Sequence, residues 1–128
     1  MKTLSNGIKI VNATPHPLKF EDGTELKPSG FLVNAEMKEV VIEELKPIDG
    51  GDPVLLVEPT PTPSPEGHAE IVKINGLYPG ALIVGSIISA QAYGGLVVGM
   101  TPAVGYERVS PAQKKMSISK FTTFPTTC

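Results

Sequence analysis

The sequence predicts a mostly β fold of the α+β class: a single small domain, residues 1–128, with one antiparallel or mixed sheet and one or two short helices. Thirteen glycines and thirteen prolines divide the chain into short apolar runs, which favours short strands over long helices. Tryptophan is absent and aromatic residues make up 5% of the chain, so the core must come from Val, Ile and Leu, which suit pleated sheets. A chain of this length buries roughly two-thirds of its unfolded surface and can hold a core without disulfides.

The first half of the chain reads as strands separated by turns. Asp22-Gly23 is a strong hairpin signal, because these residue types accept the positive φ angles of a tight turn. Thr14-Pro15-His16-Pro17 interrupts the first strand as a kink or a sheet edge. A helical turn over residues 36–39 is also possible, just before the strand expected over residues 39–43. Strands are expected over residues 8–12, 18–20, 25–27, 31–35, 39–43 and 54–57.

Prolines alternate over Pro59-Thr60-Pro61-Thr62-Pro63-Ser64-Pro65. This pattern predicts an extended, polyproline-type surface loop over residues 59–65, because proline lacks an amide donor for a ladder or a helix. Residues 68–74 then read as the returning strand. A linker between two domains is the alternative, but neither half holds enough apolar residues for its own core.

The second half is expected to contain the helices. Ser86 is placed to cap a short helix over residues 86–93, which Gly94-Gly95 would end. Ser110-Pro111-Ala112-Gln113 predicts a second helix over about 111–116, with a capping Ser and a Pro in the first turn. Strands are expected over residues 81–84, 96–100 and 120–124.

Charge and composition argue against several classes of function. The net charge of −2 is too small to steer the chain toward nucleic acid, although Lys114, Lys115, Lys120 and Arg108 form a local basic stretch. Residues 1–6 do not read as a secretion signal. Glycine and proline divide the apolar stretch from Ile74 to Tyr106 into pieces far shorter than the roughly 20 residues of a spanning helix, so no membrane partner is expected. The lone Cys128 cannot form an internal disulfide, so either the chain lives in a reducing compartment or its stability comes from other sources.

His16 is the most interesting titratable residue. The prolines on both sides stiffen its backbone and could hold the imidazole for binding or proton transfer. Asn12, Thr14 and Ser29 are its candidate neighbours. The alternative is a histidine that only fixes the kink. Ser86 is a further binding candidate, because free amides at a helix start attract anions, although capping explains it fully.

No cofactor or metal is expected. Glu66, His68 and Glu70 would share one face of a strand, but this spacing is a weak metal signal. The chain has neither a phosphate-binding loop nor a dinucleotide fingerprint. Cys128 at a terminus lacks the fixed setting of a nucleophile.

Residues 10–17, Ile-Val-Asn-Ala-Thr-Pro-His-Pro, resemble the opening of a family of small uncharacterised proteins of phages, other mobile elements and prokaryotes. That family typically begins with a strand followed by Asn-Leu-Thr-Pro-His. Pro28-Ser29-Gly30, and the Pro-Gly turn, apolar strand and small-residue helix over Tyr78 to Tyr93, follow in the same order as in the family. The resemblance implies a viral or mobile-element setting, with the protein in the host cytoplasm or the virion. It supplies no functional residues.

Two functions are therefore expected. The first is a non-enzymatic binding or assembly module that self-associates as a homo-oligomer, through sheet edges or the apolar region 74–106. The second is a small protein that binds, sequesters or hydrolyses a nucleotide-like molecule, with His16 in its pocket. A nucleic-acid accessory protein using Lys114 to Lys120 is a weaker third hypothesis. Proline-rich loops and charged strands also hint at a thermophile.

Overall fold

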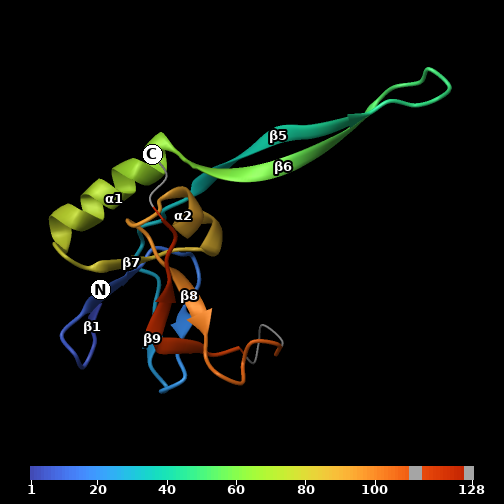
Figure 1. The fold of residues 1–128 in the computed structure, drawn as a ribbon. Helices are drawn as coiled ribbons and strands as arrows, with labels where there is room; N and C mark the ends of the chain where they lie inside the picture. The colour runs from blue at the N-terminus through green and yellow to red at the C-terminus, as the bar shows by residue number, and fades with distance from the viewer. Residues whose placement is uncertain (110–113, 126–128) are drawn as a thin grey trace.

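The computed structural model describes residues 1–109 and 114–125. These residues form a mostly β structure with two short helices, in which a long two-stranded ribbon projects from a rounded body (Figure 1). The elements in chain order are β1 (Lys2–Thr3), β2 (Lys9–Asn12), β3 (Leu18–Lys19), β4 (Glu25–Leu26), β5 (Ala35–Leu45), β6 (Val54–Pro63), α1 (Pro65–Leu77), β7 (Leu82–Val84), α2 (Ile87–Ala92), β8 (Gly99–Pro102) and β9 (Met116–Thr122). The predicted fold class is confirmed. The strands form one three-stranded and three two-stranded sheets, however, rather than one sheet.

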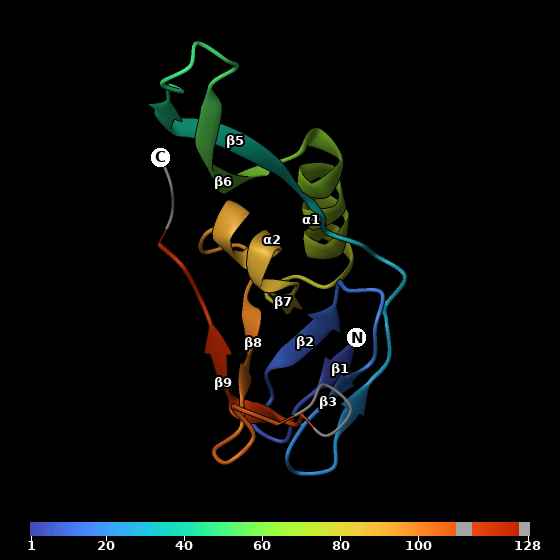
Figure 2. The same cartoon turned by 90° about the vertical axis from the view of Figure 1, so that its right-hand side faces the viewer.

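A three-stranded sheet, in the order β1-β2-β7, lies at the centre of the body (Figure 2). β1 runs antiparallel to β2, whereas β2 and β7 are parallel. Successive residues of β2 face opposite sides of the sheet, so Ile10 belongs to one apolar cluster and Val11 to the other. Both are fully buried, and β2 therefore has a core on each face.

The two clusters recruit different parts of the chain. Val11 packs with residues from β7, α1 and α2, including Ile83, Ile71 and Tyr93. Ile10 packs with Phe20 and Leu26 next to the β3–β4 hairpin, and residues of β8 and β9 cover them. The apolar region 74–106 thus supplies part of the core, while Leu77, Ile87, Ile88, Leu96 and Val104 within it are exposed.

Helix α2 and the β3–β4 hairpin form as the sequence predicts. The Ser86 hydroxyl accepts a hydrogen bond from the Ser89 amide at 3.1 Å, and the helix ends at Ala92. Gly23 has a φ of 89° in the turn between β3 and β4.

Helix α1 corrects the strand predicted over residues 68–74. Ser64 caps it by accepting from the Gly67 amide at 3.0 Å, and Pro65 occupies the first turn, where no amide donor is needed. Ile71 and Ile74, three residues apart, point into the core. This is helical spacing, whereas the strand prediction relied on the alternation of Ala69, Ile71 and Lys73.

The proline-rich segment is not the unpaired loop predicted over 59–65. Residues 59–63 belong to β6, where Pro59, Pro61 and Pro63 lie opposite Glu39, Met37 and Ala35 of β5. Alternate residues of an antiparallel pair point their amides toward the partner or away from it. Prolines at every second position can all face away, so β6 keeps its ladder to β5 while its outer edge has no amide donors at these positions.

The C-terminal part differs from the prediction as well. Residues 111–113 of the helix expected over 111–116 lie outside the described residues, while Met116 begins strand β9 rather than ending a helix. β9 pairs with β8, and the Phe121 ring meets Phe20 edge-on with centroids 6.3 Å apart. The predicted strand 120–124 is therefore shifted toward the N-terminus. A contact with Phe20, distant in sequence, helps to fix it.

Candidate functional site

Asn12, one of the predicted binding residues, is fully buried at the end of β2 and anchors the kink that follows it. Its side-chain amide donates to the carbonyl of His16 at 2.7 Å and to that of Leu26 at 3.1 Å. Its Oδ1 accepts from the amide of Thr14 at 3.0 Å and from the Thr14 hydroxyl at 2.6 Å. All the donors and acceptors of this side chain are engaged within the protein.

Ser29 joins the same cluster from the other side. Its amide and its hydroxyl both donate to the Asn12 carbonyl, at 3.0 and 2.6 Å, and its Oγ accepts from the Phe31 amide. The structure thus brings together Asn12, Thr14, His16 and Ser29, which the sequence analysis named as candidate neighbours. Their hydrogen bonds join three segments of the chain to one another.

His16 takes part in this cluster through its backbone alone, and its side chain is exposed. It lines none of the three clefts described here. The geometry accounts for His16 as part of the kink, and a nucleotide-like ligand at this residue stays a prediction. Ser86 is likewise occupied: its Oγ lies 3.2 Å from that of Ser89, whose hydroxyl donates to the Val33 carbonyl at 2.7 Å.

A second polar cluster, which the sequence analysis missed, lies where the ribbon joins the body. The buried Tyr93 hydroxyl accepts from the Ser64 amide at 2.8 Å and donates to the Asn34 carbonyl at 2.9 Å. Ser64 follows β6 and Asn34 precedes β5, so one hydroxyl ties both ends of the ribbon to α2. A Cβ on Gly67 would overlap both the Tyr93 hydroxyl and the Asn34 carbonyl. The Ser-Pro signature at residues 64–65 could have revealed this helix start.

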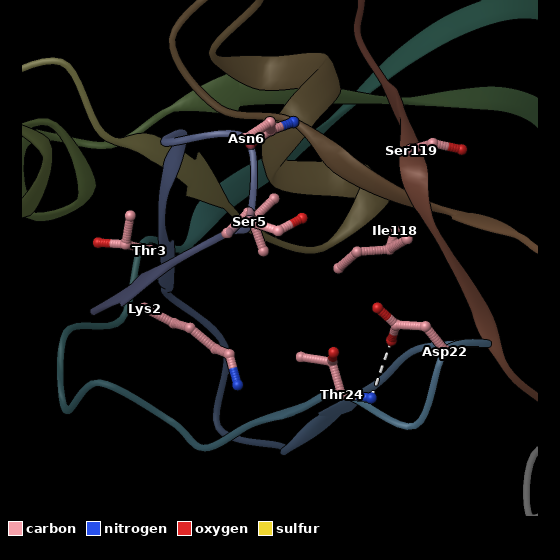
Figure 3. Close-up of a pocket in the computed structure, with 9 residues that line it drawn as sticks. Lys2, Thr3, Ser5, Asn6, Asp22, Thr24, Ile118 and Ser119 are labelled. Atoms are coloured by element: carbon pink, nitrogen blue, oxygen red, sulfur yellow. Dashed lines mark hydrogen bonds between the residues drawn. The ribbon is translucent and has the colours of Figure 1, made fainter.

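A cleft of about 330 Å³ opens between the N-terminal segment, the β3–β4 turn and β9 (Figure 3). Lys2 and Asp22 lie on opposite sides of it. The Thr24 amide donates to Asp22 Oδ1 at 2.8 Å, and this hydrogen bond holds the pKa of the Asp22 carboxyl below 3.8. The carboxylate is thereby used in its own turn, as is common for Asp before Gly. Nothing in the cleft points to a particular ligand.

The second cleft, of about 350 Å³, is an open hollow beside the start of α1 and includes Glu66 and Glu70. Glu70 pairs with Lys73 at 3.2 Å on the helix surface. Glu66, His68 and Glu70 do not share a strand face, because they lie on α1. Within residues 1–109 and 114–125, no group of three His, Cys, Asp or Glu side chains is placed to hold a metal ion. The third cleft lies at the turn of the ribbon.

The most unusual surface of the molecule is the ribbon, which comprises β5, β6 and the turn between them, residues 35–63. The body consists of the other described residues. Unlike the body, the ribbon contains no buried residue. Nine of its apolar side chains are 40–61% exposed, and Ile48 at the turn is fully exposed. The nine are Met37, Val40, Val41, Ile42, Leu45, Val54, Leu55, Leu56 and Val57. Exposed apolar surface gathered in this way usually marks a contact with a partner.

The register assigns these side chains to two unlike faces. Opposed residues of an antiparallel pair share a face, and a bulge after Val41 places Ile42 outside the ladder. The first face, called the apolar face, carries ten residues, of which only Glu39 and Glu44 are charged. Its other members are Ala35, Met37, Val41, Leu55, Val57, Pro59, Pro61 and Pro63. The opposite face carries Glu36, Lys38, Val40, Glu43, Leu45, Val54, Leu56, Glu58, Thr60 and Thr62.

Charge also separates the ribbon from the rest of the chain. Residues 35–63 contain seven acidic and two basic side chains, a net charge of −5, whereas the remaining sequence contains six acidic and nine basic ones, a net charge of +3. The total of −2 conceals this division. This division of charge can be read from the sequence only once the bounds of the ribbon are known. Without those bounds, the two apolar strands resemble strands of a buried core.

Neither α1 nor α2 has the length and apolar character needed to cross a bilayer, and these are the helices of the described residues. Compared with models of protein families, with curated proteins and with solved structures, the chain matches none.

Proposed function

We propose that this protein is a non-enzymatic assembly module that associates with further copies of itself through the apolar face of the ribbon. The observation that carries the proposal is the ribbon itself: two paired strands, β5 of 11 residues and β6 of 10, without a buried side chain. An isolated two-stranded hairpin is marginally stable in water. A partner that covers the apolar face would supply the burial that the body does not provide.

The proline pattern indicates how the ribbon makes contact. Sheet edges recruit other strands by hydrogen bonding, and Pro59, Pro61 and Pro63 remove three donors from the outer edge of β6. Pairing along this stretch of β6 is therefore unfavourable, which favours contact through the face. An anionic membrane is a poor partner, because the ribbon is itself strongly acidic.

The apolar face alone supports only weak association. Covering a half-exposed Val, Leu or Met contributes roughly 1 kcal/mol. Met37, Val41, Leu55 and Val57 together would give about 4 kcal/mol, near the lower end of the roughly 4–15 kcal/mol that association costs. We therefore propose self-association that depends on protein concentration and on further contacts beside this face.

The resemblance of residues 10–17 to phage and mobile-element proteins supports a viral or mobile-element setting for such a module. In that setting the protein would act in the host cytoplasm or in the virion. Assembly proteins are needed in both places, and their function requires contacts rather than catalytic groups.

Sedimentation velocity over a concentration series tests the proposal. The double variant Val41→Thr, Val57→Thr changes two residues that oppose each other on the apolar face and keeps β-branched side chains in both strands. We expect the unmodified protein to gain mass with concentration, and the variant to need about tenfold more protein for the same mass, equivalent to about 1.4 kcal/mol.

The matched control is Val40→Thr, Leu56→Thr on the opposite face of the ribbon. It should shift the association midpoint by less than about threefold. An unmodified protein that stays monomeric throughout would refute self-association. Equal effects of the two double variants would show that the apolar face is not the contact surface.

A further inference from the structure

The distribution of charge indicates which part of a second copy could cover the ribbon. Two ribbons packed against each other would bring together net charges of −5 and −5, with Glu39 and Glu44 on each apolar face. Like charges placed together at an interface are unfavourable. The body, by contrast, belongs to the part of the chain whose net charge is +3. The ribbon is therefore electrostatically matched to a body rather than to another ribbon.

Three of the nine basic residues outside the ribbon lie near one another in sequence at one end of the body, where Glu107 is an acidic neighbour. Arg108, Lys114 and Lys115 lie on the segments that connect β8 and β9, and the Ala103 amide donates to the Lys115 carbonyl at 3.0 Å, which joins the two segments. Val104, next to Ala103, is 86% exposed. This surface, formed by Val104, Arg108, Lys114 and Lys115, is called the basic end.

The turn of the ribbon has the complementary character. Ile48 is fully exposed at the turn, and residues 44–52 around it carry three acidic side chains, Glu44, Asp49 and Asp52, and one basic side chain, Lys46. The turn of the ribbon thus has an exposed aliphatic side chain, Ile48, near carboxylates. The basic end has an exposed aliphatic side chain, Val104, near cationic groups. Opposite charges around an apolar contact are the arrangement that selects a partner and fixes its orientation.

The two surfaces cannot meet within one molecule of this shape. The ribbon leaves the body at the end that carries α1 and α2, while the segment after β8 lies at the other end, in both views (Figures 1 and 2). β5 alone spans about 35 Å, from its 11 residues at about 3.3 Å each, and it extends away from the basic end.

We infer that the partner surface for the ribbon is the basic end of a second copy of this chain, with Ile48 and the acidic turn placed against Val104, Arg108, Lys114 and Lys115. This inference rests on the proposed self-association and names its contact. The contact joins two different surfaces, so each copy carries one donor ribbon and one acceptor end. Such contacts either close on themselves or continue from copy to copy.

A complementation experiment tests the inference with full-length chains. The ribbon variant carries Ile48→Ser, Val41→Thr and Val57→Thr and keeps its basic end. The acceptor variant carries Arg108→Glu, Lys114→Glu and Lys115→Glu and keeps its ribbon. We expect each variant alone to remain monomeric by sedimentation velocity at concentrations where the unmodified protein associates. Their equimolar mixture should form a 1:1 complex that grows no further.

Salt gives an independent measurement. Because the proposed contact joins opposite charges, the association constant of the unmodified protein should fall by about tenfold as screening increases from low to high ionic strength. Packing of ribbon on ribbon would be strengthened by salt instead. An association constant that rises with salt would overturn the inference.

The matched control reverses the same number of charges elsewhere. Lys9→Glu, Lys27→Glu, Lys73→Glu changes three exposed lysines outside the basic end and should associate within about threefold of the unmodified protein. If it disrupts association as strongly as the acceptor variant, net charge rather than the basic end is responsible. Should the acceptor variant lose its native circular dichroism, Arg108→Gln, Lys115→Gln replaces it with the same expectation.

The remaining outcomes separate the two proposals. If the acceptor variant alone associates as the unmodified protein does, the basic end is not the partner surface and self-association through the ribbon stands. If the ribbon variant alone still associates, the proposed function itself fails. If both are monomeric and the mixture is monomeric as well, the donor and acceptor surfaces do not meet.

Discussion

The body and the ribbon contain similar apolar residues, but the body buries them and the ribbon leaves them exposed. In the body, valines and isoleucines are fully buried on both sides of β2, and within residues 1–109 and 114–125 every buried side-chain nitrogen or oxygen has a hydrogen-bond partner. In the ribbon, comparable residues form a ladder, interrupted by one bulge, with both faces exposed. Backbone pairing is therefore not what distinguishes them. The difference is that only the body supplies a second layer for its apolar side chains.

The junction between the two regions carries the largest expected effect. Gly67→Ala would place a methyl group where the Tyr93 hydroxyl and the Asn34 carbonyl already lie, and should lower the free energy of unfolding by about 3 to 5 kcal/mol. Gly76→Ala is the control on the same helix, because its Cβ would meet nothing within 4 Å. It should stabilise the protein by about 0.5 to 1 kcal/mol in urea denaturation.

The kink after β2 comes next. Asn12→Ala removes four hydrogen bonds from a fully buried site and leaves the carbonyls of His16 and Leu26 without this donor, so unfolding should become easier by about 2 to 4 kcal/mol. His16→Ala should cost less than about 0.5 kcal/mol, since only the backbone of His16 is used. If both variants lost the same free energy of unfolding, the His16 imidazole would have a structural role beyond the backbone hydrogen bonds described above.

The same substitution in the two regions tests the comparison directly. Val84→Thr in β7 puts a hydroxyl into a fully buried position and should lower the free energy of unfolding by about 1 to 3 kcal/mol. Val41→Thr in β5 places it on the exposed ribbon and should change that free energy by less than about 0.5 kcal/mol in dilute, monomeric protein. Chemical denaturation of both variants at low concentration measures the contrast, which would disappear if the ribbon folded onto the body.

The smallest expected effect concerns the turn between β3 and β4. The Thr24 amide favours the charged form of Asp22, so the folded-state pKa lies below 3.8 and the stabilisation is present above the unfolded pKa. It is lost as the pH falls through the lower, folded-state pKa. NMR titration of the Asp22 carboxyl should give a midpoint under 3.8. A midpoint at or above that value would show that the turn does not hold the carboxylate in solution.

Local signals in the sequence predicted much of the body. The Asp22-Gly23 turn and the Ser86 cap needed only a few neighbouring residues, and the structure confirms both. Asn12, Thr14, His16 and Ser29 were named from the sequence as candidate neighbours. Their contacts were not predicted, because Ser29 must reach the Asn12 carbonyl from 17 residues away.

Helix α1 shows where local reading failed. Ser64-Pro65 is the same kind of helix start as the one predicted at Ser110-Pro111, but the prolines before it suggested a loop. The decision for a helix depends on Ile71 and Ile74 finding a core and on Gly67 fitting beneath Tyr93. Each of these partners lies in another segment of the chain.

The sequence by itself determined the fold class, the turn at Asp22-Gly23 and the start of helix α2 at Ser86. Only the tertiary structure decided that Val40, Val41 and Leu55 would be exposed, while Val11 and Val84 would be buried. Apolar strands look alike in sequence because their side chains obey the same alternation. Whether a second layer covers them depends on where the rest of the chain can reach, and a ribbon that extends beyond that reach keeps its apolar side chains exposed.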